Sequence, residues 1–358
     1  MSCFVLILLR GFAGGIRVVK LGGRVYKSRM RIRLSSALAL LGLSILGCLV
    51  WVGCDKKTET PTGTKPATTQ LTIAVIPKGT THSFWQSIRA GAEAAGKELD
   101  CKIFWNGPER EGDRERQIQI VEDVIAQKVD AVVLAPLDSR ALVPSVENLA
   151  NRNIPCVIVD SGIETERYAT FAATDNYQGG VLAARRMGEI LGGKGNLLVL
   201  KYAQGSASTI ARENGFIETI QKEFPEMKLV DTKYGLDTVE TALQAAEDLL
   251  TRNQNVQGFF ACNESTAVGT LQALASQKRS EIKMVGFDSA PALLQALRGG
   301  QIDALIVQNP YKMGYEGVKA AVAAVKHQSV TKKMDTGVAV VTKASLEDPK
   351  IKELLRIQ

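Results

Sequence analysis

From residue 71 onward the chain alternates between short, β-prone apolar runs and longer amphipathic stretches. Apolar runs of this length predict buried strands, and the amphipathic stretches predict helices that pack on a sheet. The strands predicted in the first half are Leu71–Ile76, Cys101–Trp105, Ala131–Leu134, Cys156–Val159 and Ala169–Ala173. The intervening helices include Phe84–Leu99 and Gln117–Lys128.

A second series of the same kind follows in the second half of the chain. Its predicted strands are Asn196–Leu200, Lys228–Val230, Val256–Ala261, Ile282–Phe287 and Ile302–Val307. Its predicted helices are Ile210–Phe224, Thr238–Arg252, Ser265–Gln277 and Pro291–Arg298. Strands that alternate with helices form parallel, doubly wound sheets. Two such series predict an α/β fold of two doubly wound parallel-sheet lobes rather than one oversized sheet.

Ahead of these series lies a segment typical of an export signal. Arg31 and Arg33 precede an apolar run, Leu34–Val52, which ends at Gly53-Cys54 before the polar Asp55-Lys56-Lys57. This pattern resembles the lipobox of bacterial lipoproteins, in which the signal is cleaved before a cysteine that carries the acyl chains. We expect a chain that is exported, lipid-anchored to the membrane and facing the periplasm or the cell exterior.

Two alternatives remain open for this segment. Cys48 also follows a fitting sequence, but cleavage there would leave an apolar head on the mature chain, so Cys54 is favoured. An uncleaved helix over the 19 residues Leu34–Val52 would also tether the chain, since that length nearly spans a bilayer. Met30 directly precedes the charged beginning of this signal, where an initiator methionine is expected. Residues 1–29 are therefore expected not to be translated. We assign residues 1–53 to the signal and 54–70, rich in Thr and Pro, to a disordered linker.

The charge of the chain is concentrated in the predicted signal. The whole sequence carries +7, but residues 1–53 hold eight Lys or Arg and no Asp or Glu, which leaves −1 for the remainder. The basic pI near 9.0 therefore does not indicate a nucleic-acid partner for the working part of the chain.

The cysteines of the two lobes are predicted to be buried free thiols. Cys101, Cys156 and Cys262 are odd in number and lie in or beside apolar runs. A flavodoxin-like strand order would separate the strands of Cys101 and Cys156 by roughly 14 Å. Disulfide geometry requires Cα atoms within about 7 Å.

Polar residues directly follow many of the predicted strands. They are Lys78, Asn106, Asp138, Asp160, Asn263, Asp288 and Gln308. Open parallel sheets bind ligands at the carboxyl ends of their strands. Any one such residue is more often a cap or turn residue, and Asp138 is expected to cap a helix near Arg140. Seven at equivalent positions predict two walls that close on a small ligand rich in hydrogen-bonding groups.

Several short segments, in order along the chain, extend this pattern. They are Ile73–Ile76, Thr80–Trp85, Ile154–Ser161, Ala173–Asn176, Ala211–Glu213, Asn263-Glu264, Val285–Asp288 and Gln308. Together they resemble the periplasmic sugar-binding proteins of the ribose-binding type, the substrate-capture components of ABC importers. The resemblance covers residues 71 to about 343. It implies capture of a sugar in a cleft and delivery to an ABC permease.

Carried over position by position, the resemblance implies ten ligand-binding residues. They are Lys78, His82, Phe84, Trp85, Asp160, Ser161, Arg212, Asn263, Asp288 and Gln308. Carboxylates, amides and cations would bind sugar hydroxyls, and an aromatic ring would cover the C–H face of the sugar. For Phe84 and Trp85 the alternative is that they pack in the core of the first helix.

Four positions depart from the ribose-binding pattern. Lys78 replaces a small polar residue, His82 an amide, and Ser161 an arginine, while Leu236 stands where the second lobe usually supplies an aromatic ring. These changes move a cation within the cleft and reduce its stacking surface. They disfavour ribose itself and leave a hexose, an acidic sugar or a modified sugar open.

The same resemblance implies a three-strand hinge that closes on the ligand. Crossings are expected near Ala173–Asn176, Gln308–Pro310 and Asp335–Val338. Lobe one would comprise residues 71–173 plus 309–337, and lobe two residues 174–308 plus 338–358.

Other function classes find little support in the sequence. It has no Gly-x-Ser-x-Gly elbow, Gly-x-Gly-x-x-Gly fingerprint, Walker loop or His-Glu-x-x-His, so we predict no enzyme activity and no cofactor. Its two histidines, His82 and His327, lie far apart, and no metal site is predicted. A lactose-type repressor would need a helix-turn-helix where this chain has a signal. A monomer is expected, and presentation of the ligand to a membrane receptor or sensor kinase remains the alternative function.

Overall fold

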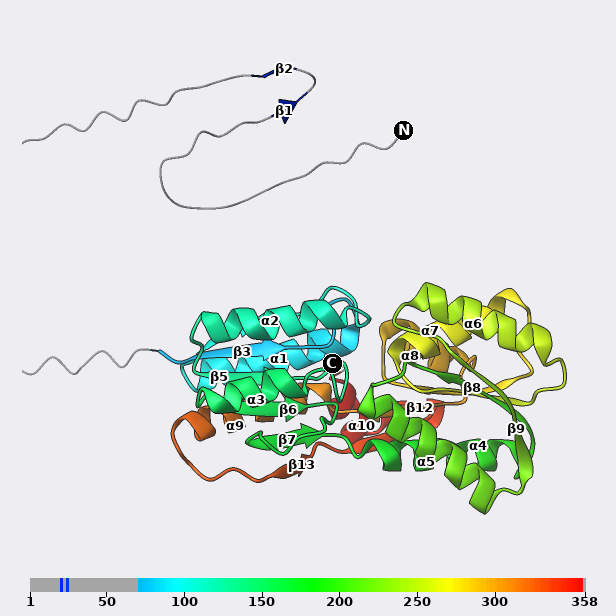
Figure 1. Cartoon of the computed structure of the whole chain (residues 1–358). Coiled ribbons are helices and arrows are strands. Elements are labelled where there is room, and N and C mark those ends of the chain that lie inside the picture. The colour runs from blue at the N-terminus through cyan, green and yellow to red at the C-terminus, as the bar shows by residue number, and fades with distance from the viewer. Residues whose placement is uncertain (1–19, 22–23, 26–69, 357–358) are drawn as a thin grey trace, which may run out of the picture. The chain divides into compact units, whose positions relative to one another are not determined.

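The computed structural model of the chain describes residues 20–21, 24–25 and 70–356 (Figure 1). Within the unit formed by residues 1–65, β1 (Lys20–Leu21) and β2 (Arg24–Val25) pair in antiparallel fashion. The predicted signal run 34–52, both candidate lipid-attachment cysteines and linker residues 54–69 lie outside the described residues. No helix of the described part has the length and apolar character needed to cross a membrane.

Residues 66–358 form the second unit, which contains two six-stranded sheets. The first sheet has the order β13-β7-β6-β5-β3-β4, and all its strands are parallel. Its strands are β3 (Thr72–Ile76), β4 (Lys102–Trp105), β5 (Ala131–Leu134), β6 (Cys156–Val159), β7 (Thr170–Ala173) and β13 (Lys333–Asp335). Its helices are α1 (Ser83–Glu98), α2 (Arg114–Ala126), α3 (Val143–Asn151) and α9 (Pro310–Val325). We call this part lobe one.

Lobe two contains the second sheet, in the order β14-β12-β11-β10-β8-β9, in which β14 alone runs antiparallel to its neighbour. Its strands are β8 (Lys194–Lys201), β9 (Glu226–Tyr234), β10 (Gly258–Ala261), β11 (Lys283–Phe287), β12 (Ala304–Gln308) and β14 (Val338–Val341). Its helices are α4 (Asn176–Leu191), α5 (Ala207–Glu223), α6 (Val239–Arg252), α7 (Glu264–Ser276), α8 (Pro291–Gly299), the 3-10 helix η1 (Lys343–Glu347) and α10 (Pro349–Leu355).

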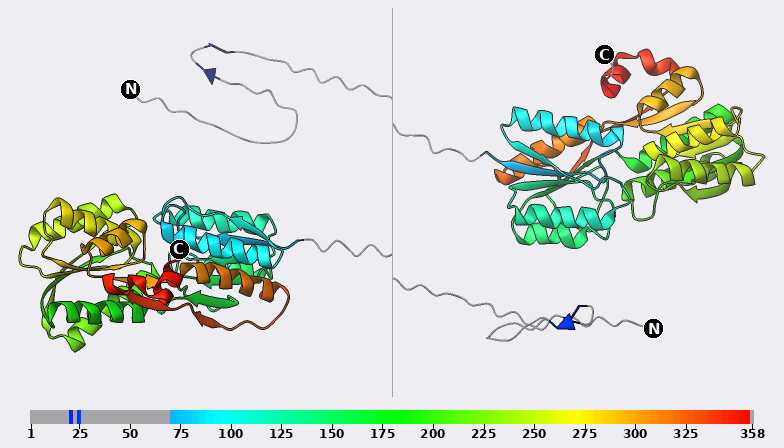
Figure 2. Two further views of the ribbon diagram at one scale, coloured as in Figure 1. Left: turned by 180° about the vertical axis from the view of Figure 1, so that it is seen from behind. Right: turned by 90° about the horizontal axis from the view of Figure 1, so that it is seen from above.

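Each sheet is buried on both faces, as Figure 2 shows from two further directions. In β3, Ile73 and Val75 belong to the core beneath α1 and α9, whereas Ala74 and Ile76 belong to the core beneath α2 and α3. Alternate side chains of a strand point to opposite faces, so continuous apolar runs are what a doubly covered parallel sheet requires. Lobe two repeats this arrangement, with α4 and α5 on one face and α6, α7 and α8 on the other.

The predicted fold class is therefore confirmed: two doubly wound α/β lobes joined by three crossings. The chain passes from β7 to α4, from β12 to α9 and from β13 to β14. The strand orders also match position for position, so that β6 corresponds to β11 and β3 to β8. The lobes therefore share one strand order and differ at the edge, where β13 is parallel to its neighbour and β14 is antiparallel.

Three edge strands differ from the expectation, and one of them, β14, lies outside the predicted strands. β9 spans Glu226–Tyr234 rather than 228–230, because exposed polar residues alternate along this edge and hide the strand signal. β13, at the other sheet's edge, is only three residues long and was not predicted. The cysteine prediction is confirmed: among the described residues Cys101, Cys156 and Cys262 are buried and free, with the strands of the first two three positions apart.

Glycine pairs bring two helices of each lobe into backbone contact. A Cβ atom at Gly91 of α1 would lie 2.0 Å from the carbonyl oxygen of Tyr311 in α9, and one at Gly314 of α9 would lie 2.0 Å from that of Ile88. In lobe two, Gly215 of α5 and Gly180 of α4 make the same approach, with 2.2 and 2.1 Å. α1 and α5 begin at the carboxyl ends of the equivalent strands β3 and β8, so these contacts fix the helices that border the space between the lobes.

Candidate ligand-binding cavity between the lobes

A cavity of about 20 Å³ lies where the carboxyl ends of both sheets meet. This free space suits about one water molecule. The cavity is lined by Lys78, His82, Phe84, Trp85, Glu111, Asp160, Tyr202, Ser206, Ser208, Thr209, Arg212, Asn263, Glu264, Asp288 and Gln308. Both lobes contribute, and the lobes close tightly on each other in this structure.

The first wall, from lobe one, contains a buried ion pair. Lys78 follows β3 and Asp160 follows β6, and Nζ of Lys78 lies 2.8 Å from Oδ2 of Asp160. Both side chains are buried, so each charge depends on the other for its stabilisation. Asp160 adopts a left-handed backbone conformation (φ 61°), a strained geometry of the kind often found at functional sites.

A second ion pair lies beside the first helix. His82 Nδ1 and Trp85 Nε1 both lie 2.6 Å from Oε1 of Glu111. Burial opposes the charged form of His82, but the hydrogen bond and charge of Glu111 outweigh it and raise the pKa of His82 to about 9. Burial likewise opposes ionisation of Glu111, yet the hydrogen bond and charge of His82 hold its pKa at about 2. Both groups are therefore charged at neutral pH.

The aromatic residues of this wall have different environments. Trp85 is 2% exposed and belongs to the lobe-one core, whereas Phe84 is only partly buried. Their rings meet edge to face with centroids 4.9 Å apart. Both line the cavity, so the core position of Trp85 and a ligand-facing position are compatible.

The second wall, from lobe two, is centred on Arg212 of α5. Its Nε donates to Oδ1 of Asn176 over 2.8 Å, and its Nη1 donates to the carbonyl oxygen of Cys262 over 3.1 Å. Its guanidinium carbon lies 4.0 Å from the centre of the Phe287 ring. These contacts fix the orientation of the guanidinium group. Its Nη2 lies 4.0 Å from Oδ1 of Asp160 across the cavity.

Asp288 and Gln308 complete the second wall from the ends of β11 and β12. Nε2 of Gln308 donates to Oδ1 of Asp288 over 2.7 Å, and Oε1 of Gln308 is buried without a hydrogen-bond partner. Burial raises the pKa of Asp288 to about 6, although Arg212 and Gln308 both favour its ionised form. An unpartnered buried acceptor of this kind favours a ligand that donates hydrogen bonds.

Asn263 is the N-cap of α7 and its side chain is engaged locally. Its Oδ1 accepts from the backbone N–H of Thr266, and its Nδ2 donates to Oγ of Ser265 over 3.1 Å. Helix capping by itself accounts for an asparagine at this position. Asn263 nevertheless also lines the cavity.

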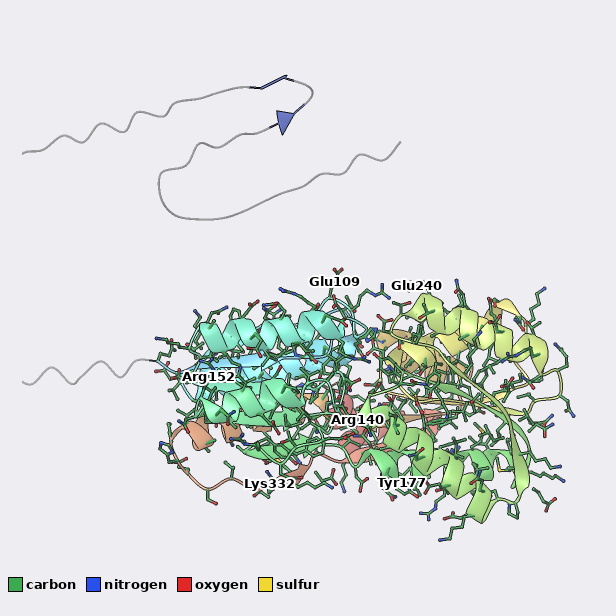
Figure 3. All side chains as sticks on the ribbon, viewed as in Figure 1. Glu109, Arg140, Arg152, Tyr177, Glu240 and Lys332 are labelled. Atoms are coloured by element: carbon green, nitrogen blue, oxygen red, sulfur yellow. The ribbon has the colours of Figure 1, made fainter. Side chains whose placement is uncertain are left out.

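Direct hydrogen bonds also join the two lobes around the cavity. Lys78 Nζ donates to Oγ of Ser208 over 3.0 Å, and the Arg110 side chain pairs with Asp237 over 3.1 Å at the exposed rim. The backbone N–H of Ser139 donates to the carbonyl oxygen of Gly205 over 3.0 Å. Figure 3 shows Arg140, the next residue, at this junction.

The structure brings nine of the ten expected site residues to the cavity lining. Ser161 is placed differently: its Oγ accepts from the backbone N–H of Ser208 over 3.1 Å and joins the lobes beside the cavity. Leu236, Asn106 and Asp138 also lie outside the lining. Asp138 accepts from the backbone N–H groups of Arg140 and Ala141, as a capping residue does.

Sequence reasoning did not assign six of the lining residues. They are Glu111, Tyr202, Ser206, Ser208, Thr209 and Glu264. Tyr202 directly follows β8, the equivalent of the strand before Lys78, so the strand-end rule offered a signal for it. Glu111 lies in the loop between β4 and α2, where nothing in the local pattern marks it.

Comparison with known proteins supplies the family. The sequence profile of the periplasmic binding protein domain matches residues 73–329. This chain belongs to the periplasmic binding protein family. Its curated relatives include the D-allose-binding periplasmic protein of Escherichia coli, 30% identical over 72% of this chain and 85% of the relative. The ribose import binding protein of Bacillus subtilis is 29% identical over 74% of this chain and 86% of its own length.

Solved structures of periplasmic binding proteins match the fold closely. A carbohydrate transporter solute-binding protein from Agrobacterium radiobacter, in complex with D-arabinose, is 37% identical with a TM-score of 0.79, and the match covers 81% of this chain and 100% of that chain. An ABC transporter solute-binding protein from Agrobacterium vitis with bound D-fucose is 36% identical with a TM-score of 0.76, over 78% and 98%. Among the described residues of this periplasmic binding protein, no cluster of His, Cys, Asp or Glu could hold a metal ion.

Proposed function

We propose that this chain captures an uncharged sugar between its two lobes and delivers it to an ABC importer, as a binding protein rather than an enzyme. The cavity lining carries the proposal, because both lobes supply hydroxyl-binding groups there. Relatives that bind D-arabinose and D-fucose share the fold over most of its length. The ten residues carried over from the sequence are the proposed ligand contacts, with Ser161 acting beside the cavity.

The charges of the cavity favour a neutral ligand over a sugar acid. Among the described lining residues, four carboxylates face three cations. Lys78 and His82 are each within 3 Å of a carboxylate oxygen, and Arg212 lies 4.0 Å from Asp160. An anionic sugar would have to displace these pairs and would meet Asp288 and Glu264. Hydroxyl groups can instead donate to carboxylates and to Oε1 of Gln308 without adding charge.

Capture requires the lobes to separate from the arrangement seen here. Space for about one water cannot admit a monosaccharide, so entry requires the cross-lobe bonds of Lys78 and Arg110 to open. We propose that hinge rotation at the three crossings opens the cavity and that the ligand bridges the lobes on closure. The closed form then differs from the open one in the surface that a permease meets.

We also propose that the chain is exported and works as a monomer tethered by lipid. Arg31, Arg33 and the apolar run to Val52 support export, and the Gly53-Cys54 sequence supports acylation of Cys54, with Cys48 as the alternative. Mass spectrometry of the protein purified from membranes distinguishes these cysteines by the mass of the acylated N-terminal peptide.

Titration calorimetry with matched sugars tests the proposed function. D-Fucose and D-galacturonate share a ring and differ at C6, where the second carries a carboxylate. We expect D-fucose, D-arabinose or another neutral sugar of the panel to bind with a dissociation constant near or below about 1 μM, a binding free energy of about −8 kcal/mol. We expect D-galacturonate to bind at least about tenfold more weakly, because like charges repel in a partly buried site.

Two substitutions show whether a measured affinity belongs to this cavity. Arg212→Ala and Asp288→Ala should each abolish binding, whereas Lys332→Ala, far from the cavity on lobe one (Figure 3), should leave it unchanged. Failure of every neutral sugar to bind the folded protein contradicts the proposed function, and tighter binding of the sugar acid contradicts the charge argument.

A further inference from the structure

One carboxylate of lobe two sits on the first turn of a lobe-one helix. Oε1 of Glu264 accepts from the backbone N–H of Ser83 over 3.0 Å, and Oε2 accepts from the N–H of Phe84 over 3.0 Å. Oε2 also accepts from Oγ of Ser83 over 2.9 Å. Glu264 is 9% exposed, so these three bonds form largely out of water.

Helix α1 has little other capping of its own. Its N-cap, His82, makes no side-chain capping bond, and its first turn contains no acidic residue. The first N–H groups of a helix lack intrahelical partners, and the helix dipole favours a negative charge beside them. Glu264 meets both requirements from the opposite lobe, so this cap can exist only while the lobes are closed.

The cap is connected to the ligand-facing groups of lobe two. The backbone N–H of Glu264 donates to Oδ2 of Asp288 over 2.9 Å, while Oδ1 of Asp288 accepts from Gln308. On the lobe-one side, the capped turn carries His82, Phe84 and Trp85, all of which line the cavity. Glu264 thus links the ligand-facing ends of both walls through three consecutive hydrogen-bonded contacts.

We propose that Glu264 is a positioning residue that couples lobe closure to ligand capture by capping α1 across the cleft. This role rests on the proposed function, because closure matters only if a ligand is held by it. The bonds to Ser83 and Phe84 stabilise the closed form and orient the turn that carries the aromatic residues. A ligand that needs closure gains affinity in proportion to that stabilisation.

Two variants remove the cap from opposite sides. Glu264→Gln removes the charge, with Glu226→Gln as the control that removes the same charge from an exposed position of the same lobe. Ser83→Pro removes both Ser83 donors, while proline is well suited to the first position of a helix. His82, the preceding residue, already has the extended backbone (φ −73°, ψ 148°) that proline prefers before it. Ser83→Pro should therefore leave the backbone of lobe one unchanged.

Amide hydrogen exchange provides a readout that needs no ligand. In the wild-type protein we expect the Ser83 and Phe84 amides to be protected. In Glu264→Gln we expect both to exchange faster, by about threefold to thirtyfold, the range of N-cap losses. In Ser83→Pro the Phe84 amide should also exchange faster, although the Glu264 charge is still present. The amides of Ala92 and Ala95, deeper in α1, should exchange at unchanged rates in all variants.

Affinity for D-fucose and D-arabinose provides the second readout. Glu264→Gln and Ser83→Pro should each raise the dissociation constant by about threefold to thirtyfold. Because both variants weaken the same contact between Glu264 and the first turn of α1, the effect of the double variant should be smaller than the product of the two single effects. Multiplying effects, or unprotected Ser83 and Phe84 amides in the wild-type protein, would overturn the proposed role. If no sugar binds any form, the proposed function fails while the exchange experiment still decides the role of Glu264.

Discussion

Asp160 and Asp288 occupy equivalent positions in the two lobes. Asp160 directly follows β6 and Asp288 directly follows β11, which hold the same position in the two sheet orders. Both residues have a left-handed backbone, with φ of 61° and 72°. Each donates its backbone N–H to the neighbouring strand, Asp160 to Ala172 and Asp288 to Ile306. Aspartate tolerates this conformation better than most residues, and the turn directs both carboxylates to the cavity. Their partners differ: Asp160 pairs with Lys78, whereas Asp288 accepts a hydrogen bond from Gln308.

Asp288→Asn should change how stability depends on pH. The pKa of Asp288 is raised from 3.8 to about 6, so the folded state binds more protons than the unfolded state between these values. This group therefore lowers the free energy of unfolding as the pH rises from 3.8 to 6, by up to about 3 kcal/mol. The variant should gain stability relative to the wild type over that window, measured by urea unfolding at pH 4 and pH 7.

Asparagine suits this test because it shares the tolerance of aspartate for a left-handed backbone. Contributions from other groups cancel in the difference between the two proteins. A constant difference in unfolding free energy between pH 4 and pH 7 would show that Asp288 is not destabilised by its burial.

His82 should remain protonated well above neutral pH. Its pKa is raised to about 9 by Glu111, so protonation of His82 contributes stability that is complete below pH 6.5 and disappears as the pH rises through 9. The chain has only two histidines, so imidazole NMR signals of His82 can be assigned with a His327→Gln variant. Titration of His82 with a midpoint below 7 would contradict the ion pair with Glu111.

Removing one partner of the Lys78–Asp160 pair should be more harmful than removing both. Asp160→Asn keeps a residue that tolerates the left-handed backbone, leaves the buried ammonium of Lys78 uncompensated, and should lower the free energy of unfolding by about 3–5 kcal/mol. Lys78→Met in the same chain should restore most of that loss. Neither variant should bind sugar, which separates the stabilising role of the pair from its place in the cavity.

Thermal unfolding and calorimetry on the same samples measure the two effects. The pair Arg89–Glu93 on the exposed face of α1 is the control, because exposed pairs contribute less than about 1 kcal/mol. Equal losses from breaking the buried and the exposed pair would exclude a structural role for Lys78 and Asp160.

Alanine should not be tolerated where α1 and α9 touch. Gly91→Ala or Gly314→Ala would place a Cβ atom 2.0 Å from a backbone oxygen, so the helices must move apart. We expect losses of about 1–3 kcal/mol or more despite the higher helix propensity of alanine. Gly299→Ala, at the exposed end of α8 with its nearest neighbour 3.6 Å away, should be neutral or stabilising in the same thermal-unfolding assay.

The sequence predicted the features that depend on strand position. Lys78, Asp160, Asp288 and Gln308 were found because the carboxyl ends of parallel strands face one ligand site. Glu111 escaped notice because a loop, and not a strand, carries it to His82 and Trp85. Glu264 follows Asn263 in a recognised segment, but its partners lie 180 and 181 residues away in the other lobe. Contacts that form between the lobes only when they close do not affect the hydrophobic periodicity from which helices and strands are predicted.

The glycine contacts between helices make the first turns of α4 and α9 rigid parts of their lobes. α9 begins directly after Asn309 and α4 directly after Asp175, and each is pressed backbone to backbone onto its partner within its first two turns. We therefore propose that the lobes rotate at Thr174–Asp175, Asn309 and Thr336–Gly337, the short segments between these rigid helix pairs. Substitutions in the cavity lining can then change which sugar is held, and substitutions in these three linking segments can change how fast it is released. Either kind of change can occur with little effect on the other property.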